Sequence, residues 1–209
     1  MPTKGETTKA KIIRTAAALA YRQGFQTTGL QEILDRCAVP KGSFYFHFPS
    51  KDALCEAVVK LRQNVILKRV QHIFSGAAPL RDEVARWFDT LTEFAEGEGQ
   101  FCGCPVGNLA QELSTVNEPL RQEIARFFAA AAEALAVRLR EAQEQGEIPA
   151  ALDPLHLANF LLQLTQGAQL LVKVERSARP LRESRDIMLT LLCGESRKEQ
   201  TRTKGGCRA

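Results

Sequence analysis

The amino-acid sequence predicts an all-α fold of about nine helices, with a small N-terminal module of three helices and a larger helical body. Two observations lead to this prediction. Apolar residues recur at spacings of three and four through most of the chain, which is the period of a helix with one buried face. Gly24, Gly97 and Gly146 stand between these stretches, where helices commonly end. We find no convincing strand pattern and no internal repeat.

The first helix is expected over residues 8–23, where Ile13 and Ala16 share one apolar face. Thr28 then suits the N-cap of a second helix, with Gln31 three residues on as its capping-box partner. The first helix and the one that follows Thr28 would belong to the same small N-terminal module.

The stretch over residues 30–51, LQEILDRCAVPKGSFYFHFPSK, predicts two short helices joined by a tight turn. Pro40 suits the opening of the second short helix, because its missing N–H would have no partner in a first helical turn. Ser50 can cap the long helix that follows. A helix-turn-helix of this kind makes a DNA-binding regulator the first functional hypothesis.

The rest of the chain predicts six longer helices and a tail. The helices are expected over about 51–72, 80–96, 101–116, 119–145, 154–172 and 181–193. Residues 195–209 are polar and basic, and we expect them to form a disordered tail. We therefore predict a DNA-binding domain over residues 1–50 and a ligand-binding and dimerisation domain over residues 51–194.

Composition and charge narrow the class of protein. The chain has 209 residues, of which 44% are hydrophobic, so a sizeable core is expected. No apolar run is long enough for a membrane span, and the start lacks an apolar signal core, so a cytoplasmic protein is expected. Residues 1–60 hold nine Lys and Arg against five Asp and Glu. This excess of +4 falls on the helix-turn-helix end, as phosphate binding requires.

The second short helix carries side chains that suit a DNA backbone. Small residues at its start let the backbone approach closely, and Lys41, Tyr45 and His47 can reach phosphates. Phe44 and Phe48 are expected in the core of the module. Which bases such a short helix reads stays open, because it offers few base-reading side chains beyond Ser43.

The segment TTGLQEILDRCAVPKGSFYFHFPSKDAL resembles the DNA-binding domain of the tetracycline-repressor (TetR) family over about residues 8–58. The matching positions are Gly24, Phe25, Thr27, Thr28, Ile33, Val39, Lys41, Gly42, Ser43, Tyr45, Phe48, Ser50, Lys51 and Leu54. Two positions depart from the pattern. Ala38 stands where the family usually has Gly, and Pro40 stands at a common Ser position.

The resemblance implies a homodimer that places one short helix of each subunit in a major groove, with a ligand cavity in the body. The residues at the family's DNA-contacting positions are Thr28, Lys41, Gly42, Ser43, Tyr45, Phe46, His47 and Lys51. Dimerisation is implied through the last two helices, for which we predict Leu157, Leu161, Leu164, Ala168, Met188, Leu191 and Leu192. The stretch over 157–172 is apolar around more than one stripe, which favours burial against a second surface.

The segment FCGCPVGNLAQELS is similar to a Gly-Cys-x-x-Gly-Asn segment of one subgroup of these regulators, some of which respond to electrophiles. Cys104 would lie at a helix N-terminus, where N–H dipoles favour the nucleophilic thiolate, and Cys102 could be a resolving partner. Two alternatives stay open, namely that both thiols are small buried groups or that they bind a metal. The further candidates for a ligand cavity are Trp87, Asn108, Phe127 and Phe160.

Other thiols and other functions can be weighed from the same sequence. Six cysteines are scattered at Cys37, Cys55, Cys102, Cys104, Cys193 and Cys207, and we interpret them as reduced thiols. No phosphate-binding Gly-rich loop, HExxH or GxSxG motif is present, so an enzyme is not expected. A helical interaction protein and a transcriptional activator remain as alternatives.

We therefore predict a ligand-responsive DNA-binding transcriptional regulator without cofactor or metal. It would act as a repressor that binds a palindromic operator in double-stranded DNA as a homodimer, away from membranes. Release would follow the binding of a small-molecule effector or the modification of a thiol, and electrophiles are one candidate class of effector.

Overall fold

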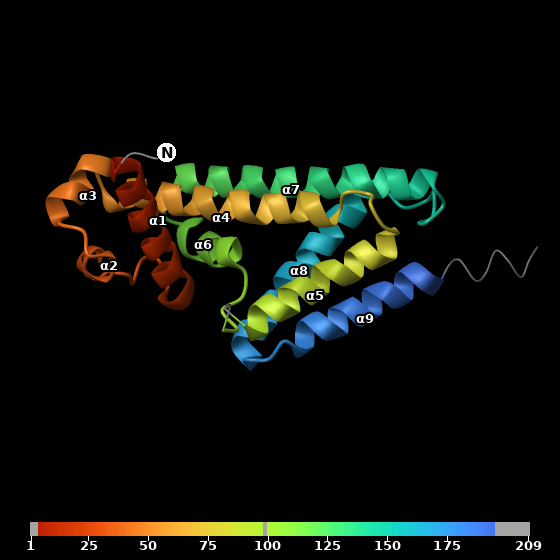
Figure 1. Ribbon diagram of the computed structural model, residues 1–209. Coiled ribbons are helices and arrows are strands. Elements are labelled where there is room, and N and C mark those ends of the chain that lie inside the picture. Colours follow the sequence, from red (N-terminus) through yellow and green to blue (C-terminus); the bar gives the residue numbers. More distant parts are fainter. Residues whose placement is uncertain (1–3, 98–99, 195–209) are drawn as a thin grey trace, which may run out of the picture. The chain divides into compact units, whose positions relative to one another are not determined.

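The computed structural model describes residues 4–97 and 100–194, and within these residues it consists of nine α-helices without a strand (Figure 1). The helices are α1 Lys4–Gln23, α2 Leu30–Cys37, α3 Lys41–His47, α4 Lys51–Ile73, α5 Leu80–Glu96, α6 Pro105–Leu113, α7 Glu118–Glu144, α8 Pro154–Glu175 and α9 Arg179–Gly194. The predicted all-α fold is confirmed. The predicted tail over 195–209 lies outside the described residues. Among the described helices, none has both the length and the apolar character that a membrane crossing needs.

The described residues form two compact units. The first unit contains the chain up to Leu67 together with Cys104–Phe127, and the second contains Lys68–Gly103 together with the chain from Phe128 on. Helices α4 and α7 therefore contribute to both units, and α6 belongs to the same unit as α1, α2 and α3. The domain boundary predicted after residue 50 stays a prediction.

Helices α1, α2 and α3 pack against one another in the first unit. Ile12, Leu34, Phe44 and Leu54 are fully buried there, because each lies on the apolar face of its own helix. Burying a side chain of this size contributes about 1.5–3 kcal/mol. Helix α1 begins at Lys4, one turn earlier than the sequence predicted.

The predicted capping box at the start of α2 is wrong. The N-cap residue is Gly29, and no side chain accepts a hydrogen bond from the first turn. Thr28 is fully buried, and its hydroxyl donates to the carbonyl of Gly24 over 2.6 Å. The hydroxyl therefore closes the turn between α1 and α2 and does not cap a helix. The predicted cap of α4 is confirmed, because the hydroxyl of Ser50 accepts from the N–H of Ala53 over 3.1 Å.

Helices α5, α8 and α9 form the larger part of the second unit, where α9 packs against both α5 and α8. The buried face of α5 includes Val84, Trp87 and Phe88. The indole N–H of Trp87 donates to the hydroxyl of Thr165 on α8 over 3.1 Å. This hydrogen bond matters for stability because a buried N–H without an acceptor would destabilise the fold.

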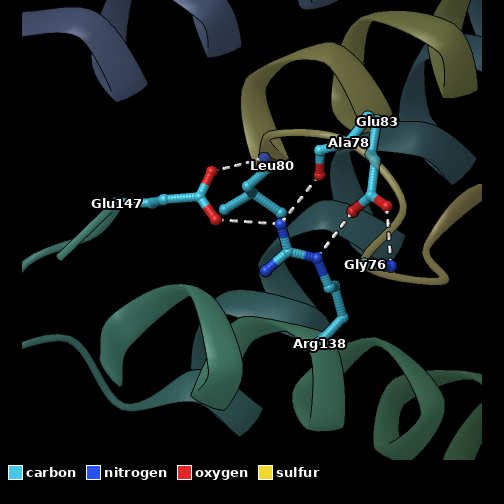
Figure 2. A network of polar contacts seen from close by, with 6 residues as sticks. All are labelled: Gly76, Ala78, Leu80, Glu83, Arg138 and Glu147. Atoms are coloured by element: carbon cyan, nitrogen blue, oxygen red, sulfur yellow. Dashed lines mark hydrogen bonds and ion pairs between the residues drawn. The ribbon is translucent and has the colours of Figure 1, made fainter. Parts of the chain in front are cut away.

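A buried ion-pair network joins α7 to α5 inside the second unit (Figure 2). The guanidinium of Arg138 donates to the carboxylate of Glu83 over 2.7 Å and to that of Glu147 over 2.9 Å. The Arg138 and Glu83 side chains are 3% and 1% exposed. Arg138 therefore supplies the positive charge without which the Glu83 carboxylate would be buried alone.

The same network fixes the turn between α4 and α5. Arg138 also donates to the carbonyl of Ala78, while Glu83 accepts from the N–H of Gly76 over 2.8 Å. The second carboxylate, from Glu147, accepts from the N–H at the start of α5 (Figure 2). Peptide groups of the turn are thus paired with charged side chains, which makes each hydrogen bond stronger than one between neutral groups.

Candidate nucleic-acid interface and sensing segment

Helix α3 is held by two phenylalanines and presents its other side chains outward. Phe44 is fully buried and stacks on Phe48 with ring centres 5.6 Å apart. Tyr45 and Phe46, which lie between them, are 51% and 83% exposed. The predicted core positions of Phe44 and Phe48 are confirmed.

The beginning of α3 is open to an approaching backbone. Lys41 and Gly42 are exposed, and Ser43 is half-buried. A Cβ added at Gly42 would meet nothing within 4 Å, so the fold of this unit does not require glycine there. Without a side chain at Gly42, the start of α3 leaves room for another backbone to approach closely.

The flanking positions predicted for phosphate contacts are engaged within the chain. The ammonium of Lys51 donates to the carbonyl of Gln26 over 3.1 Å and lies 5.1 Å from the ring centre of Phe25. Thr28 is fully buried, so a phosphate contact by its side chain does not fit this arrangement. His47 is half-buried, with its ring edge-on to Phe46.

Cys104 is the N-cap residue of α6, and Pro105 follows it in the first turn. Its sulfur accepts a hydrogen bond from the N–H of Gly107 over 3.3 Å, and the residue is 8% exposed. The predicted place of this thiol at a helix N-terminus is confirmed, while its role as a sensor stays a prediction. The sulfur of Cys104 is therefore paired with a backbone N–H of the first turn of α6.

Two neighbouring residues complete the segment. Cys102 is half-buried, and its thiol donates to the carbonyl of Gln100 over 3.7 Å. Gly103 has φ +79°, and a Cβ there would meet the carbonyl oxygen of Gln169 at 2.9 Å. The backbone conformation and the close approach to α8 both require glycine at this position.

The thiols of Cys37 and Cys55 are buried and have raised pKa values. Burial raises the pKa of Cys37, and burial followed by the negative charges of Asp52 and Glu112 raises the pKa of Cys55 to about 12. A thiol with a raised pKa is a poor nucleophile at neutral pH. Cys207 lies outside the described residues. In the described part of the chain, no group of three or more His, Cys, Asp or Glu side chains could hold a metal ion.

The residues predicted to line a cavity have different environments. Asn108 is half-buried and Phe127 is buried, both in the first unit, and Trp87 is buried in the second. Phe160 is 45% exposed on α8, and its role as a cavity residue stays a prediction. The helical period places Phe160 on the outer face of α8, opposite the face that packs in the core.

Helices α8 and α9 have an apolar face that is not covered within the described part of the chain. Its exposed residues are Phe160, Leu171 and Val174 on α8 and Ile187 and Leu191 on α9. We name these five residues the outer apolar face. The second unit therefore buries one apolar stripe of α8 and leaves another in contact with solvent, as the sequence predicted for a helix apolar around more than one stripe.

Three of the residues predicted for dimerisation need correction. Leu161, Ala168 and Met188 are buried inside the second unit and cannot reach a partner. The sequence showed apolar residues on both faces of α8, and it did not show which face the packing of α9 would cover. Of the remaining predicted residues, Leu191 is exposed and Leu157, Leu164 and Leu192 are half-buried.

Sequence reasoning missed two charged residues, Arg138 and Glu112. Arg138 is buried in the network of the second unit, and Glu112 on α6 accepts hydrogen bonds from the turn between α1 and α2. Glu83 lies 55 residues from Arg138, and Phe25 lies 87 residues from Glu112, so no local pattern indicates either contact. Such residues look like ordinary members of a solvated helix face.

Two family models match the chain. A model described as bacterial regulatory proteins of the tetR family matches residues 12–58, and one described as a tetracyclin repressor-like C-terminal domain matches residues 76–188. The matches cover the helix-turn-helix and most of the helical body.

Named relatives and solved structures agree with these models. The repressor DhaR of Mycobacterium sp. (strain GP1) is 31% identical over 81% of this chain and 84% of its own length. The repressor NemR of Escherichia coli (strain K12) is 30% identical over 83% and 88%. A crystal structure of E. coli NemR in its reduced form has a TM-score of 0.75 at 28% identity, covering 90% of this chain and 96% of that one. The regulatory protein TetR from Rhodobacter sphaeroides has a TM-score of 0.80 at 27% identity, covering 86% and 96%.

Proposed function

Because the chain belongs to the tetR family of bacterial regulatory proteins, we propose that it is a repressor that binds a palindromic operator as a dimer. Its relatives DhaR and NemR are named transcriptional repressors, which favours repression over activation. Ligand-responsive DNA-binding regulation follows from the family itself. The operator, the dimer and the signal belong to the proposal and are argued below.

The observation that carries the proposal is the outward face of α3. Phe44 and Phe48 hold the helix, and Lys41, Gly42, Tyr45 and Phe46 extend from it toward solvent. This exposed surface offers an ammonium from Lys41, a phenol hydroxyl from Tyr45 and, at Gly42, space for a close approach. These groups suit contacts with DNA phosphates and with base edges in a groove.

The DNA contact is tested with a duplex that the protein itself selects from a random pool. Lys41→Ala should weaken binding to this duplex and to a scrambled one similarly, and should reduce the slope of log affinity against log salt by about one. Lys60→Ala, which removes an exposed lysine from α4 in the same unit, is the matched control and should change neither. An unchanged salt slope in the Lys41 variant would reject the phosphate contact.

The dimer is supported by the outer apolar face. The exposed apolar side chains of α8 and α9 are the feature that a second copy would cover. Val174→Glu and Ile187→Glu should each give monomers in sedimentation equilibrium, because a carboxylate would be desolvated against an apolar surface. Val116→Glu, at an exposed apolar residue of the first unit, is the control and should remain dimeric. A dimer that persists in both outer-face variants would exclude this surface.

Thiol sensing is supported by the place of Cys104 at the start of α6, and by the relative NemR, whose solved structure is described as the reduced form. In the proposed step, the Cys104 thiolate adds to the β-carbon of an unsaturated aldehyde, and the α-carbon takes a proton. The aldehyde should release the selected duplex from the wild-type protein and from Cys102→Ser. Release that persists in Cys104→Ser would reject covalent sensing at this residue.

A further inference from the structure

A carboxylate from α6 ends in the turn that joins α1 to α2. The Oε2 atom of Glu112 accepts hydrogen bonds from the backbone N–H groups of Phe25, over 2.8 Å, and Gln26, over 3.1 Å. The side-chain amide of Gln26 returns a hydrogen bond to the backbone carbonyl of Glu112 over 3.0 Å. All of these residues belong to the first unit, so one side chain joins α6 directly to the helix-turn-helix module.

The turn is shaped to hold this carboxylate. Gly24 has φ +91°, and the two N–H groups that follow it converge on one oxygen, an arrangement that makes a concave anion-binding nest. A Cβ at Gly24 would lie 3.0 Å from Oε1 of Glu112. Glycine is thus needed both for the left-handed conformation and for the approach of the carboxylate. The nest is occupied by a residue of the chain itself.

The same turn is tied to the helices that would bind DNA. Phe25 is buried, and the hydroxyl of Thr28, the last residue before the N-cap of α2, donates to the carbonyl of Gly24. The ammonium of Lys51, the first residue of α4, donates to the carbonyl of Gln26. Movement of the turn would therefore displace the starts of α2 and α4, which lie on either side of α3 in the chain.

Helix α6 has the predicted sensor at its other end. Cys104 caps the helix, and Glu112 follows eight residues later, which is about 12 Å along the axis at 1.5 Å per residue. Both residues lie in the first unit. A short helix of this kind moves as one body, so a group attached at Cys104 would shift the carboxylate at its far end.

We propose that Glu112 is the positioning residue through which α6 sets the arrangement of the helix-turn-helix for operator binding. Withdrawal of its carboxylate leaves two backbone donors of the turn without their charged acceptor, and α2 and α3 lose their fixed place. This inference rests on the proposed DNA-binding function. It adds the residue and the contact that carry the signal.

The test uses the full chain and the duplex selected by the wild-type protein. Glu112→Ala should lower affinity for that duplex at least tenfold, while affinity for a scrambled duplex and the salt slope remain unchanged, because Lys41 keeps its phosphate contact. Glu112→Gln should lose less, since an amide oxygen can still accept from the turn. Gln111→Ala, at the exposed neighbouring residue of α6, is the matched control and should stay within twofold of wild type.

Two further measurements separate coupling from general instability and from failure of the proposed function. Thermal unfolding shows whether each variant is folded at the assay temperature. If Glu112→Ala is unfolded, the inference is tested by comparing the duplex affinity of Glu112→Gln with that of Gln111→Ala. Amide exchange in α2 and α3 should accelerate in Glu112→Gln. If the wild-type protein selects no duplex, the proposed function fails, while exchange still tests the link from α6. Operator affinity within twofold of wild type in a folded Glu112→Ala, or unchanged exchange in α2 and α3, overturns the inference.

Discussion

The contacts of Arg138 in the second unit allow the effect of one substitution, Arg138→Met, on stability to be worked out in detail. The guanidinium of Arg138 lies against the carboxylates of Glu83 and Glu147, so one positive charge is set against two negative charges (Figure 2). Methionine matches the length of the side-chain stem and removes the charge. Glu83 would then be left 1% exposed, with the N–H of Gly76 as the partner that remains to it in the network.

The expected magnitude follows from this burial. Removing one partner of a buried ion pair destabilises a protein by about 3–5 kcal/mol, because an uncompensated charge stays in the interior. In a chain of this size, each kcal/mol lowers the melting temperature by about 2–4 °C, so Arg138→Met should melt about 6–20 °C below wild type. Glu147→Gln should lose about 1 kcal/mol, since Glu147 is 23% exposed and an amide oxygen can still accept.

A second substitution tests whether the buried charge is the cause. In Arg138→Met combined with Glu83→Gln, no buried carboxylate remains, and the amide oxygen can still accept from Gly76. The double variant should therefore be more stable than Arg138→Met alone by about 1 kcal/mol or more. Urea unfolding followed by circular dichroism measures all variants at one protein concentration, because assembly makes stability depend on concentration.

Two results would refute this reasoning. The first is a loss of less than about 1 kcal/mol in Arg138→Met, which would mean that the pair is solvated in the folded protein. The second is a double variant that is no more stable than Arg138→Met, which would locate the loss in packing around the methionine and not in the charge of Glu83.

Four further outcomes are expected. Ala38 has φ +49°, a conformation that glycine adopts without strain. Ala38→Gly should therefore raise the free energy of unfolding by about 0.5–1 kcal/mol and move the urea midpoint upward. A lower midpoint would contradict this. Thr165→Val leaves the indole N–H of Trp87 unpaired and should lose about 1–3 kcal/mol, a reading that an unchanged midpoint would reject. The pKa of Cys55 is about 12 in the folded protein and near 9 in the unfolded chain, so the stability of the fold should decrease as pH rises from 9 to 12. At pH 8, peptide mapping should find Cys37 and Cys55 unalkylated until the protein unfolds.

The elements of this fold follow from local rules, and the sequence therefore predicted them. A period of three and four identifies each long helix, and glycines with positive φ end two of them, at Gly24 and Gly146. The place of Cys104 followed from Pro105, because proline marks a first helical turn. In each case the information lies within a few residues of the feature.

What the sequence could not predict depends on contacts between distant segments. The sequence shows a capping pattern at Thr28, but the Thr28 hydroxyl is buried and donates to the carbonyl of Gly24 in place of capping α2. Leu161 and Phe160 are adjacent apolar residues of α8, and the packing of α9 decides which of them is buried. Arg138 lies 55 residues from Glu83, and charges on helices are read as solvent-exposed unless a partner at that range is known.

Lys51 and Glu112 both form hydrogen bonds with the backbone of Gln26, and this joins the two halves of the proposed mechanism. Glu112 holds the N–H groups of Phe25 and Gln26, and Lys51 holds the carbonyl of Gln26. An ammonium has three N–H donors, of which the carbonyl takes one, so a phosphate can be bound without releasing the turn. The contact predicted for Lys51 therefore needs no rearrangement. The turn is therefore held from α6 by Glu112 and from α4 by Lys51, so a displaced Glu112 shifts α2 and α3 while Lys51 can keep its contact with an operator phosphate.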